Sequence, residues 1–495
     1  FTSFICWKEL MKKIIKIILW LFLFSLFLRT FRLPYYISYH QDQIRDLYYI
    51  KEYFEQGKLI LLGPKASVGN FFLPPFWYYL MSFAYLFSKS PLAPAFLTAV
   101  LSSVTAVVIF LFVKKFFSIQ LAFITAVLYA VSPLSIEYSR FAWNPNPIPL
   151  FVMLTFYYLY GFLYDLPAGR QEKKKIYFIL GTITANLAFQ LHYQGLVIFI
   201  FYFLVILFSK KFTLKRFFHY FIINVLLVSP FIIYELQNGF KNILGIINFL
   251  IKSQAVTKLK FFGIPFFIKF IIKDFSLFLA RTMFFKNQLL GYLCLFILFL
   301  SLFWFLFRLY KLYKLDKLYK LLNLFLIFSF IMLFFYKNSL IDFYLLFLIP
   351  IVIIYFVLIF KKTVGEKIAI IIFFLLILIN LFKSPAFGAY DRTFLWIRES
   401  IKKITNQKQY CINYSIFPQN FIESKYRYMI TLAENKPVYD NCDLAMYYRC
   451  DPKVKKGYYL CETAICPRAP IDLSWGKIID MNPFGSDVKI YEFEY

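Results

Sequence analysis

Long apolar runs alternate with short polar clusters along most of the chain. Eleven of these runs have about the length needed to cross a bilayer as a helix, and they lie at about 14–31, 92–113, 119–138, 147–164, 176–191, 195–209, 217–234, 288–307, 321–336, 343–360 and 367–382. Phe and Leu dominate the runs, and the ten-residue alternation of a membrane β-barrel is missing. The pattern predicts an all-α polytopic membrane protein.

Basic residues follow every second run, which predicts how the helices are oriented. They precede the first run as Met-Lys-Lys and recur at Lys114–Lys115, "AGRQEKKK", "SKKFTLKR", "RLYKLYKLDKLYK" and "KKTVGEK". Short loops rich in Lys and Arg stay on the cytoplasmic side. The first external loop, at about 32–91, and the tail 385–495 are therefore expected on the opposite side.

One segment does not follow this rule. Residues 235–287 carry several cations although the threading places them outside. Within it, Lys269, Lys273 and Arg281 recur at helical intervals among Phe and Ile, which is typical of a helix lying in the membrane interface. An extra pair of spans here is the alternative, so about eleven to thirteen spans are expected.

Composition agrees with this class. The chain has 61% apolar and 16% charged residues, whereas soluble domains average about a quarter charged. The formal net charge of +29 could suggest nucleic-acid binding, but the cations cluster at the ends of apolar runs, as membrane orientation requires. Met11 resembles a natural start, which leaves open whether residues 1–10 are native.

The tail differs from the rest. We expect residues 1–384 to form a transmembrane domain and 385–495 a small extracytoplasmic α/β domain. "FLWIRESIKKI" has helical spacing, "QYCINYSIF" reads as a strand, and "VKIYEFEY" alternates like an edge strand. Cys442–Cys450 and Cys461–Cys466 are candidate disulfides, although sequence cannot fix the connectivity. Zinc is the competing interpretation, but the tail has no histidine and no close C-x₂-C pair.

Polar residues gather at the predicted outer ends of the helices, whereas the inner ends carry mostly Lys and Arg. Asp42 and Asp46 are four residues apart and face the same way if helical. This asymmetry predicts a polar cavity opening outward; the competing interpretation is a set of solvated interfacial charges. The outer-end residues are His40, Asp42, Arg45, Asp46, Glu137, Arg140, Asn144, Asn146, Gln190, His192, Glu235 and Asp342.

Several stretches resemble a known family. "HQDQIRD", "GPKASVG", "PPFWYYL", "YAVSPLSIEYSRFAWNPNPIPLF" and "LHYQ" are similar to bacterial polyprenyl-phosphate-dependent glycosyltransferases. These are relatives of the protein O-mannosyltransferases (glycosyltransferase family 39) and of the lipid A aminoarabinose transferase, with the GT-C fold. The resemblance covers roughly residues 14–240, and it matches the later helices only in hydropathy.

The resemblance implies a reaction and its residues. In that family an aspartate of the first external loop is the general base; Asp42 matches it, and Asp46 is the second candidate. The base would deprotonate an acceptor hydroxyl that attacks the sugar of a polyprenyl-phosphate donor, with inversion. The leaving phosphate needs cations or donors, and we expect these from Lys65, Arg140 and His192, supported by Asn146, Arg45 and His40.

Some positions depart from the family. Phe72-Leu73 replaces an acid–lysine pair before the two prolines, and Asn146 stands where relatives often have an aspartate. The neutral amide argues against a metal between two carboxylates, so we expect no metal cofactor, although a divalent ion is not excluded. Because Gln43 follows Asp42, protein O-mannosylation is not implied.

The expected protein is therefore a glycosyltransferase of the bacterial cytoplasmic membrane, acting at its outer face. Its partners would be a polyprenyl-phosphate sugar and a glycan, lipid or protein acceptor. A polymerase or ligase of surface polysaccharide is one alternative. A lipid-linked-sugar flippase is another; it would favour internal symmetry and mid-membrane charge, neither of which is evident. Donor sugar, acceptor and oligomeric state are left open.

Overall fold

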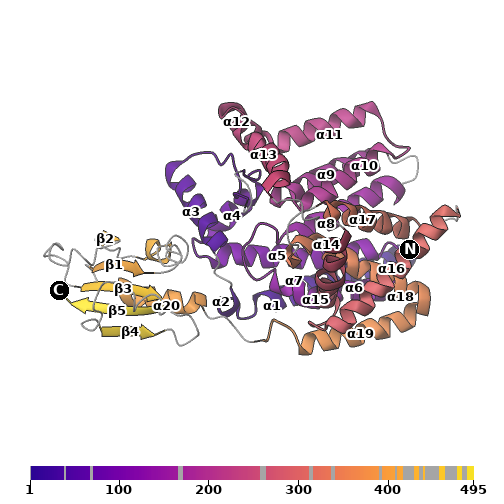
Figure 1. Cartoon of the computed structure of the whole chain (residues 1–495). Coiled ribbons are helices and arrows are strands. Elements are labelled where there is room, and N and C mark those ends of the chain that lie inside the picture. Colours follow the sequence, from indigo (N-terminus) through magenta and orange to yellow (C-terminus); the bar gives the residue numbers. More distant parts are fainter. Residues whose placement is uncertain are drawn as a thin grey trace.

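The structure is a computed structural model, with helices throughout the first four-fifths of the chain and a sheet near its C-terminus (Figure 1). It describes residues 2–37, 41–66, 71–165, 171–256, 264–311, 316–335, 341–388, 393–406, 410–415, 428–433, 439–440, 456–462, 477–481 and 488–494. His40 lies outside these residues, as do Cys442, Cys450 and Cys466.

Each of the eleven apolar runs coincides with one helix or with a broken pair of helices. The runs become α1 (Thr2–Thr30), α5 (Leu92–Val113), α6 (Ile119–Val131) with α7 (Pro133–Glu137), α8 (Ile148–Tyr160) with a π-helical turn (Gly161–Asp165), α9 (Gln171–Leu191), α10 (Gly195–Leu207), α11 (Leu214–Leu227) with α12 (Ser229–Gln237), α16 (Gln288–Tyr310), α17 (Lys317–Phe334), a 3₁₀ turn (Asp342–Leu348) with α18 (Ile349–Val364), and α19 (Glu366–Phe382). The predicted helical pattern is confirmed.

Length and composition alone mark four of the described helices as able to cross a membrane, or five if the bent pair α11 and α12 forms one span. The stricter count is lower than eleven because some predicted spans are split and others, such as α10 and α19, are shorter than 18 residues. Pro133 follows the break between α6 and α7, where Ser132 caps α7. The chain bends by 66° between α11 and α12, next to Pro230. Proline interrupts a helix because its ring removes a donor and clashes with the preceding turn.

A buried polar network supports the bend between α11 and α12. Gln190 on α9 donates to the carbonyl oxygen of Leu227 at 3.1 Å and to Asn186 at 2.6 Å. Asn186 donates in turn to Asn224 on α11 at 2.7 Å. A broken helix inside a membrane needs such partners for its freed backbone groups. The three amides therefore keep the break hydrogen-bonded.

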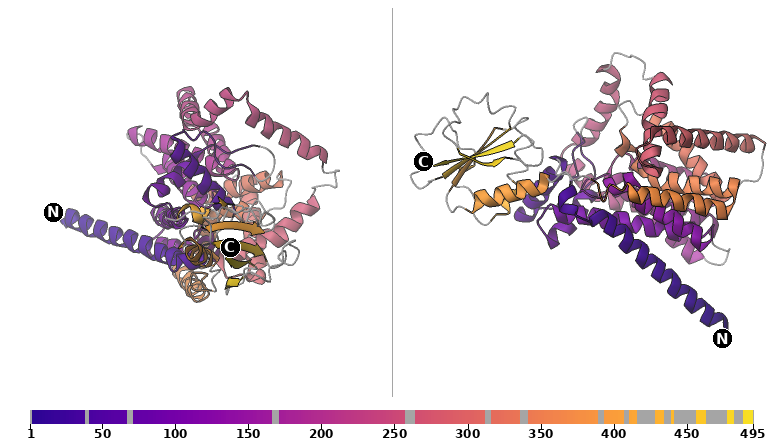
Figure 2. Two further views of the ribbon diagram at one scale, coloured as in Figure 1. Left: turned by 90° about the vertical axis from the view of Figure 1, so that its left-hand side faces the viewer. Right: turned by 90° about the horizontal axis from the view of Figure 1, so that it is seen from below.

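The core lies where α5, α6, α8 and α18 pack together, and residues 349–358 of the last of these helices are all buried. Arg29 is fully buried near the end of α1. It donates to Ser102 on α5 at 2.9 Å, to the Ala130 carbonyl on α6 at 3.0 Å, and to Ser135 on α7 at 2.7 Å. One guanidinium thus joins four helices at the α6–α7 break. At its other end, α1 projects away from the remaining helices (Figure 2).

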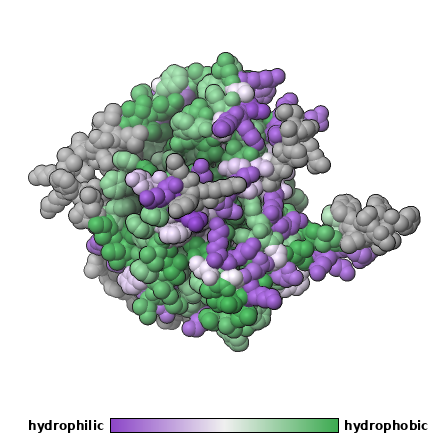
Figure 3. Space-filling model, turned by 90° about the vertical axis from the view of Figure 1, so that its right-hand side faces the viewer, coloured by the Kyte–Doolittle hydropathy of each residue, from purple (hydrophilic) through white to green (hydrophobic). Residues whose placement is uncertain are grey.

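Polar side chains gather across the end of the molecule opposite the sheet, within a largely apolar surface (Figure 3). The predicted inner loops carry lysines that pack on aromatic rings. Lys115 lies 3.8 Å from the ring centre of Tyr157, and Lys361 lies 4.3 Å from that of Phe117. Such cation–π contacts are typical of lysines at the ends of membrane helices. Together with the apolar helices, they describe an integral membrane protein.

Within 235–287, residues 241–256 and 264–283 are helical, but the prediction of an interfacial helix is wrong for the second of these stretches. The two stretches form α13 (Lys241–Val256), α14 (Ile264–Lys269), a π-helical turn (Phe270–Phe275) and α15 (Ser276–Met283). Helix α15 packs on α7, α16 and α18. Arg281 pairs there with Glu137 and Asp342 inside the protein. Helical spacing of cations does not tell a lipid interface from a contact between helices.

Three short helices lie in the predicted first external loop and begin the path to the C-terminal region. These are α2 (Leu33–Tyr36), α3 (Gln41–Gln56) and α4 (Phe76–Phe87). Helix α2 contacts α20 (Thr393–Thr405), which connects the helical part to the sheet (Figure 1). Tyr428 is fully buried; it stacks edge-on against Tyr48 of α3 and donates to the Lys89 carbonyl at 2.8 Å.

The sheet has five strands in the order β2-β1-β3-β5-β4. They are β1 (Tyr410–Ser415), β2 (Tyr439–Asp440), β3 (Lys456–Glu462), β4 (Lys477–Met481) and β5 (Val488–Glu494). Strand β1 runs parallel to β2 and β3, whereas β5 is antiparallel to β3 and β4. The stretch predicted as an edge strand is therefore an inner one, because alternation does not reveal how many neighbours a strand has. The domain boundary at 384/385 stays a prediction.

Candidate functional site

Helix α3 carries the two aspartates. Its buried face consists of Ile44, Leu47 and Ile50, at the three- and four-residue spacing of an amphipathic helix. Asp42 lies in the first turn, where a negative charge interacts favourably with the helix dipole. Asp46 comes four residues after Asp42 and therefore lies one helical turn further along α3, as the sequence predicts.

Asp46 is fully enclosed by donors. Its Oδ1 accepts from Arg45 Nε at 2.9 Å and from Tyr78 at 3.1 Å, and its Oδ2 accepts from Trp77 Nε1 at 2.8 Å. Its exposed fraction is 0%. Burial raises the pKa of Asp46, while Arg45 and Trp77 oppose the shift. Because both oxygens are occupied by donors from within the protein, the Asp46 carboxyl is held away from any substrate.

Asp42 is the accessible carboxylate of the pair. Its side chain is 35% exposed. Oδ1 accepts from an Arg45 terminal nitrogen at 2.8 Å, and Oδ2 accepts from Trp143 Nε1 at 3.1 Å. Each oxygen therefore keeps a further acceptor site. Of the two aspartates, only Asp42 can both hold a fixed orientation and take a proton from an incoming hydroxyl.

Arg45 bridges both aspartates. Burial lowers its pKa, but the two carboxylates raise it more, so that the pKa ends above its usual value. The guanidinium thus stays charged and neutralises one of two negative charges. The α3 cluster, which we define as Asp42, Arg45, Asp46, Trp77 and Tyr78, carries a net charge of about −1.

An aromatic layer lies beside Asp42. Trp143 comes from the loop between α7 and α8, and its ring lies 4.7 Å from that of Phe343 and 6.5 Å from that of Tyr138. The ring of His192 lies 6.3 Å from that of Phe343. Flat aromatic faces are suited to packing against apolar faces of a ligand. The layer joins segments that lie far apart in the sequence.

A second charged group adjoins this layer. Arg281 on α15 makes ion pairs with Glu137 and with Asp342, and Asp342 also accepts from the Tyr138 hydroxyl at 2.6 Å. We call Glu137, Arg281, Asp342 and Tyr138 the Arg281 cluster. Its side chains are partly exposed, with Asp342 at 14% and Glu137 at 33%. Through Tyr138 and Trp143 it connects to Asp42.

Residues 63–66 pair in antiparallel fashion with residues 71–73 in the predicted external loop, and we call these two paired segments the Lys65 hairpin. Gly63 donates to the Leu73 carbonyl at 2.7 Å, and Lys65 pairs with Phe72 across an isolated bridge. A Cβ on Gly63 would lie 2.3 Å from the Pro74 carbonyl oxygen, so only glycine permits this approach. Asn242 on α13 and Tyr193 both bond the Phe72 backbone. Lys65 is exposed on this fixed hairpin.

Arg140 occupies a different position from the one predicted. It is almost fully buried, and it donates to the Phe31 carbonyl and, at 3.1 Å, to the Pro385 carbonyl. Its guanidinium also lies 3.8 Å from the ring centre of Tyr36. Burial lowers the pKa of Arg140 to about 10, against the opposing effect of Tyr36, so it stays charged at pH 7. The structure uses Arg140 to hold the connection to the C-terminal region.

His192 and Asn146 are both close to the aromatic layer. Burial lowers the pKa of His192 to about 4, so its imidazole is neutral at pH 7. Its Nδ1 accepts from the Gln194 N–H at 3.3 Å, which leaves Nε2 as the proton-bearing nitrogen. Asn146 donates to the Phe141 carbonyl at 2.9 Å, and its buried Oδ1 has no hydrogen-bond partner among the described residues.

The structure therefore brings Asp42, Arg45 and Asp46 together, with His192 across the aromatic layer and Arg140 apart from them. Sequence reasoning missed Trp77, Tyr78 and Trp143, the donors that orient the aspartates. Two of these are in "PPFWYYL" and the third is in "RFAWNPNP", so the signal was present as aromatic residues beside prolines. It also missed Arg281 as the partner of Glu137 and Asp342.

Within the part of the chain that the structure describes, no three His, Cys, Asp or Glu side chains lie close enough together to form a metal site. The carboxylates that the site does contain are engaged by arginines: Asp42 and Asp46 by Arg45, Glu137 and Asp342 by Arg281.

Comparisons with known proteins give a family match over part of the chain and a similar fold over nearly all of it. Residues 73–234, about a third of the chain, match the family model described as dolichyl-phosphate-mannose-protein mannosyltransferase. The fold is similar to that of ArnT from Cupriavidus metallidurans in the apo state, with 10% identity, 98% of each chain covered and a TM-score of 0.57. A sequence search of proteins with curated functions gave no match.

Two further structures give lower scores. ArnT from the same organism bound to undecaprenyl phosphate has 10% identity, 98% coverage of each chain and a TM-score of 0.44. The Archaeoglobus fulgidus oligosaccharyltransferase in the apo form has 13% identity, 91% coverage of this chain and 70% of that chain, and a TM-score of 0.49. The fold assignment rests on apo ArnT. The predicted resemblance to membrane glycosyltransferases with the GT-C fold is confirmed.

Proposed function

We propose that this protein is an inverting glycosyltransferase that moves a sugar from a polyprenyl phosphate to an acceptor hydroxyl, with Asp42 as the general base. The observation that carries the proposal is the contrast between the two aspartates of α3. Asp46 is fully buried, and its two oxygens accept four hydrogen bonds, from Arg45, Trp77 and Tyr78. Asp42 is partly exposed, oriented by Arg45 and Trp143, and has acceptor capacity to spare.

The reaction needs few groups. Asp42 takes the proton of the acceptor hydroxyl as its oxygen forms a bond to the anomeric carbon. The bond from that carbon to the phosphate oxygen breaks, and the lipid phosphate leaves with the electron pair. General-base assistance of this kind contributes about 10²–10⁴ in rate. Because the attack is a single displacement, a second carboxylate acting as nucleophile is not required.

The leaving phosphate needs positive charge or donors. Lys65 is suited to this role because it is an exposed cation on a hairpin held by Asn242 and Tyr193. His192 contributes an N–H from its neutral ring, not a charge. We assign Arg140 to positioning the C-terminal connection, since its guanidinium is committed to backbone carbonyls.

We further propose that the site faces the extracytoplasmic side of a bacterial membrane and works without a divalent metal. The lysine-rich loops at the opposite end support this orientation. The pairing of the carboxylates with Arg45 and Arg281 supports metal independence. Dialysis against EDTA should leave the transfer rate unchanged, and restoration of a lost rate by Mg²⁺ or Mn²⁺ would overturn this part.

The test is release of free polyprenyl phosphate from a panel of polyprenyl-phosphate sugars, with envelope lipid as acceptor. Asp42→Asn should lose release by about 10²–10⁴-fold. The matched control is Glu52→Gln, an exposed carboxyl on the same helix, which should keep the wild-type rate. Equal release by Asp42→Asn and wild type would contradict the assigned base. No release by wild type with any donor would favour transport of the lipid-linked sugar.

A further inference from the structure

An apolar stripe runs along each of the helices α16 and α19. On α16 the exposed residues recur every three or four positions, and so do those on α19. All are at least 37% exposed: Leu289, Leu293, Phe296, Leu300 and Phe303 on α16, and Ile368, Ile371, Leu375, Leu378 and Phe382 on α19. In an integral membrane protein, stripes of this kind contact lipid chains.

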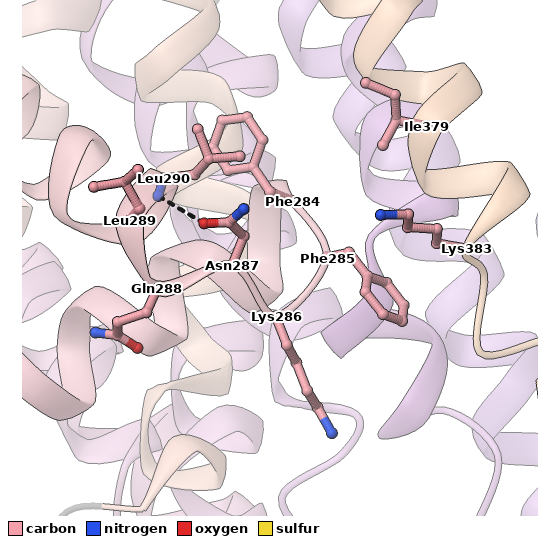
Figure 4. A pocket seen from close by; sticks show the side chains of 9 residues that line it. All are labelled: Phe284, Phe285, Lys286, Asn287, Gln288, Leu289, Leu290, Ile379 and Lys383. Carbon is pink, nitrogen blue, oxygen red and sulfur yellow. Dashed lines mark hydrogen bonds between the residues drawn. The ribbon is translucent and has the colours of Figure 1, made fainter.

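A cavity of about 520 Å³ lies where the two stripes end. It is formed by the α15–α16 connection (residues 284–287) and the first turn of α16 (residues 288–290), together with Ile379 and Lys383 at the end of α19. Figure 4 shows Lys383 pointing across toward this connection and Lys286 extending from it at the cavity edge. Lys383 lies 5.9 Å from the ring centre of Phe285. None of the nine lining residues is acidic.

The cavity therefore combines a cationic rim with apolar walls that continue into the membrane surface. Phe284, Leu290 and Ile379 line it, and Leu289 begins the α16 stripe. Lysines near helix ends commonly reach toward the interface without forming a site. Here both lysines line one cavity, Lys286 from the α15–α16 connection and Lys383 from the residue that follows α19, which such anchoring does not require.

From this geometry we propose that the cavity binds the headgroup of an anionic phospholipid, with the phosphate between Lys286 and Lys383 and the acyl chains along the two stripes. The chemistry is complementary, because two ammonium groups without a nearby acid in the lining match a headgroup of net negative charge. A zwitterionic headgroup would bring an unpaired cation beside the lysines.

The site is separate from the α3 cluster but lies at the same end of the bundle. Met283 precedes the cavity connection, and its carbonyl accepts from the buried Asn380 of α19 at 3.0 Å. Arg281 is two residues earlier, on the same helix. A bound lipid would thus contact the segment that follows the Arg281 cluster, without touching the residues assigned to transfer.

Native mass spectrometry of the purified full-length protein in mixed micelles tests the proposal. Wild type should retain one phosphatidylglycerol in preference to phosphatidylcholine. Since a lysine near a membrane surface contributes about 1 kcal/mol toward an anionic lipid, Lys286→Gln and Lys383→Gln should each weaken retention about five-fold, and together about thirty-fold. The control pair is Lys58→Gln with Lys89→Gln, two exposed lysines elsewhere, which should retain the lipid as wild type does.

Three results would overturn the assignment. The first is equal retention by the double variant and wild type. The second is equal retention of phosphatidylcholine and phosphatidylglycerol by wild type, which would show that charge is not recognised. The third is displacement of phosphatidylglycerol by millimolar inorganic phosphate alone, which would make the cavity a site for a soluble anion.

Discussion

Replacing Asp46 by asparagine should unfold the protein more easily, because that carboxylate anchors the helix bearing the base. It receives hydrogen bonds from Arg45 at 2.7 and 2.9 Å, from Trp77 at 2.8 Å and from Tyr78 at 3.1 Å. Asparagine keeps the shape of the side chain but removes the negative charge opposite Arg45. Its amide N–H would also face one of these donors, so that one hydrogen bond would be lost. Removing one partner of a buried ion pair costs about 3–5 kcal/mol.

Replacing Asp42 by asparagine should have the opposite profile. Its ion pair with Arg45 is about a third exposed on both sides, and pairs of that kind contribute about 0–1 kcal/mol. The variant should therefore unfold near the wild-type temperature while losing about 10²–10⁴ in transfer rate. The two substitutions differ by one helical turn and remove the same charge, so each serves as the control for the other.

The measurement is thermal unfolding in one detergent and lipid mixture, followed by tryptophan fluorescence and by residual transfer activity. Unfolding of membrane proteins is often irreversible, so half-lives at fixed temperature are compared as well. If Asp46→Asn unfolds at the wild-type temperature, the native Asp46 carboxyl is neutral and burial outweighs Arg45. If Asp42→Asn is the more destabilised variant, the assignment of roles within the α3 cluster is reversed.

Three further changes test neighbouring features. Trp143→Phe removes the N–H that orients Asp42 while keeping an aromatic ring, so transfer should fall about tenfold with a stability loss of about 1–3 kcal/mol; an unchanged rate would deny Trp143 that role. Gly195→Ala places a Cβ 1.9 Å from the Ala188 carbonyl oxygen and should cost at least about 1–3 kcal/mol, whereas the control Gly388→Ala meets its first atom at 3.8 Å and should be neutral. Burial lowers the pKa of His192 to about 4 in the folded protein, below its usual 6.5, so the unfolded chain takes the proton first as the pH falls. The free energy of unfolding should therefore be highest above pH 6.5 and fall toward pH 4, by at most about 3 kcal/mol. His192→Gln should remove this part of the dependence of the unfolding temperature on pH.

The helices and the aspartate-bearing loop could be predicted because both depend on local pattern. Each predicted apolar run coincides with a helix or a broken pair of helices, and the four-residue spacing of Asp42 and Asp46 places them on one face of α3, where both contact Arg45. What the pattern could not supply was the difference between them. That difference depends on Trp77 and Tyr78 from α4 and on Trp143 from the α7–α8 loop, and such partners are set by tertiary packing.

The partners of two cations could not be predicted for the same reason. Arg281 has the spacing of an interfacial cation, yet it lies between Glu137 and Asp342, because the identity of the opposing surface is not encoded in one helix. Arg140 was expected to contact phosphate, but the chain places it on the carbonyls of Phe31 and Pro385. A cation at the end of a predicted span has several partners within reach, and the sequence does not choose among them.

The contacts of Tyr428 limit how the protein can be divided. Its ring packs on Tyr48 of α3 and its hydroxyl bonds the Lys89 carbonyl, while Tyr36 donates to the Gly388 carbonyl. A chimera joined at residue 385 would exchange one half of these contacts for a foreign surface and expose aromatic area on the helix that carries Asp42. Domain swaps intended to change acceptor choice therefore need to transfer the α3 surface together with the C-terminal region. A swap of the C-terminal region alone would disturb the helix that carries Asp42, and a loss of activity could then not be attributed to the acceptor.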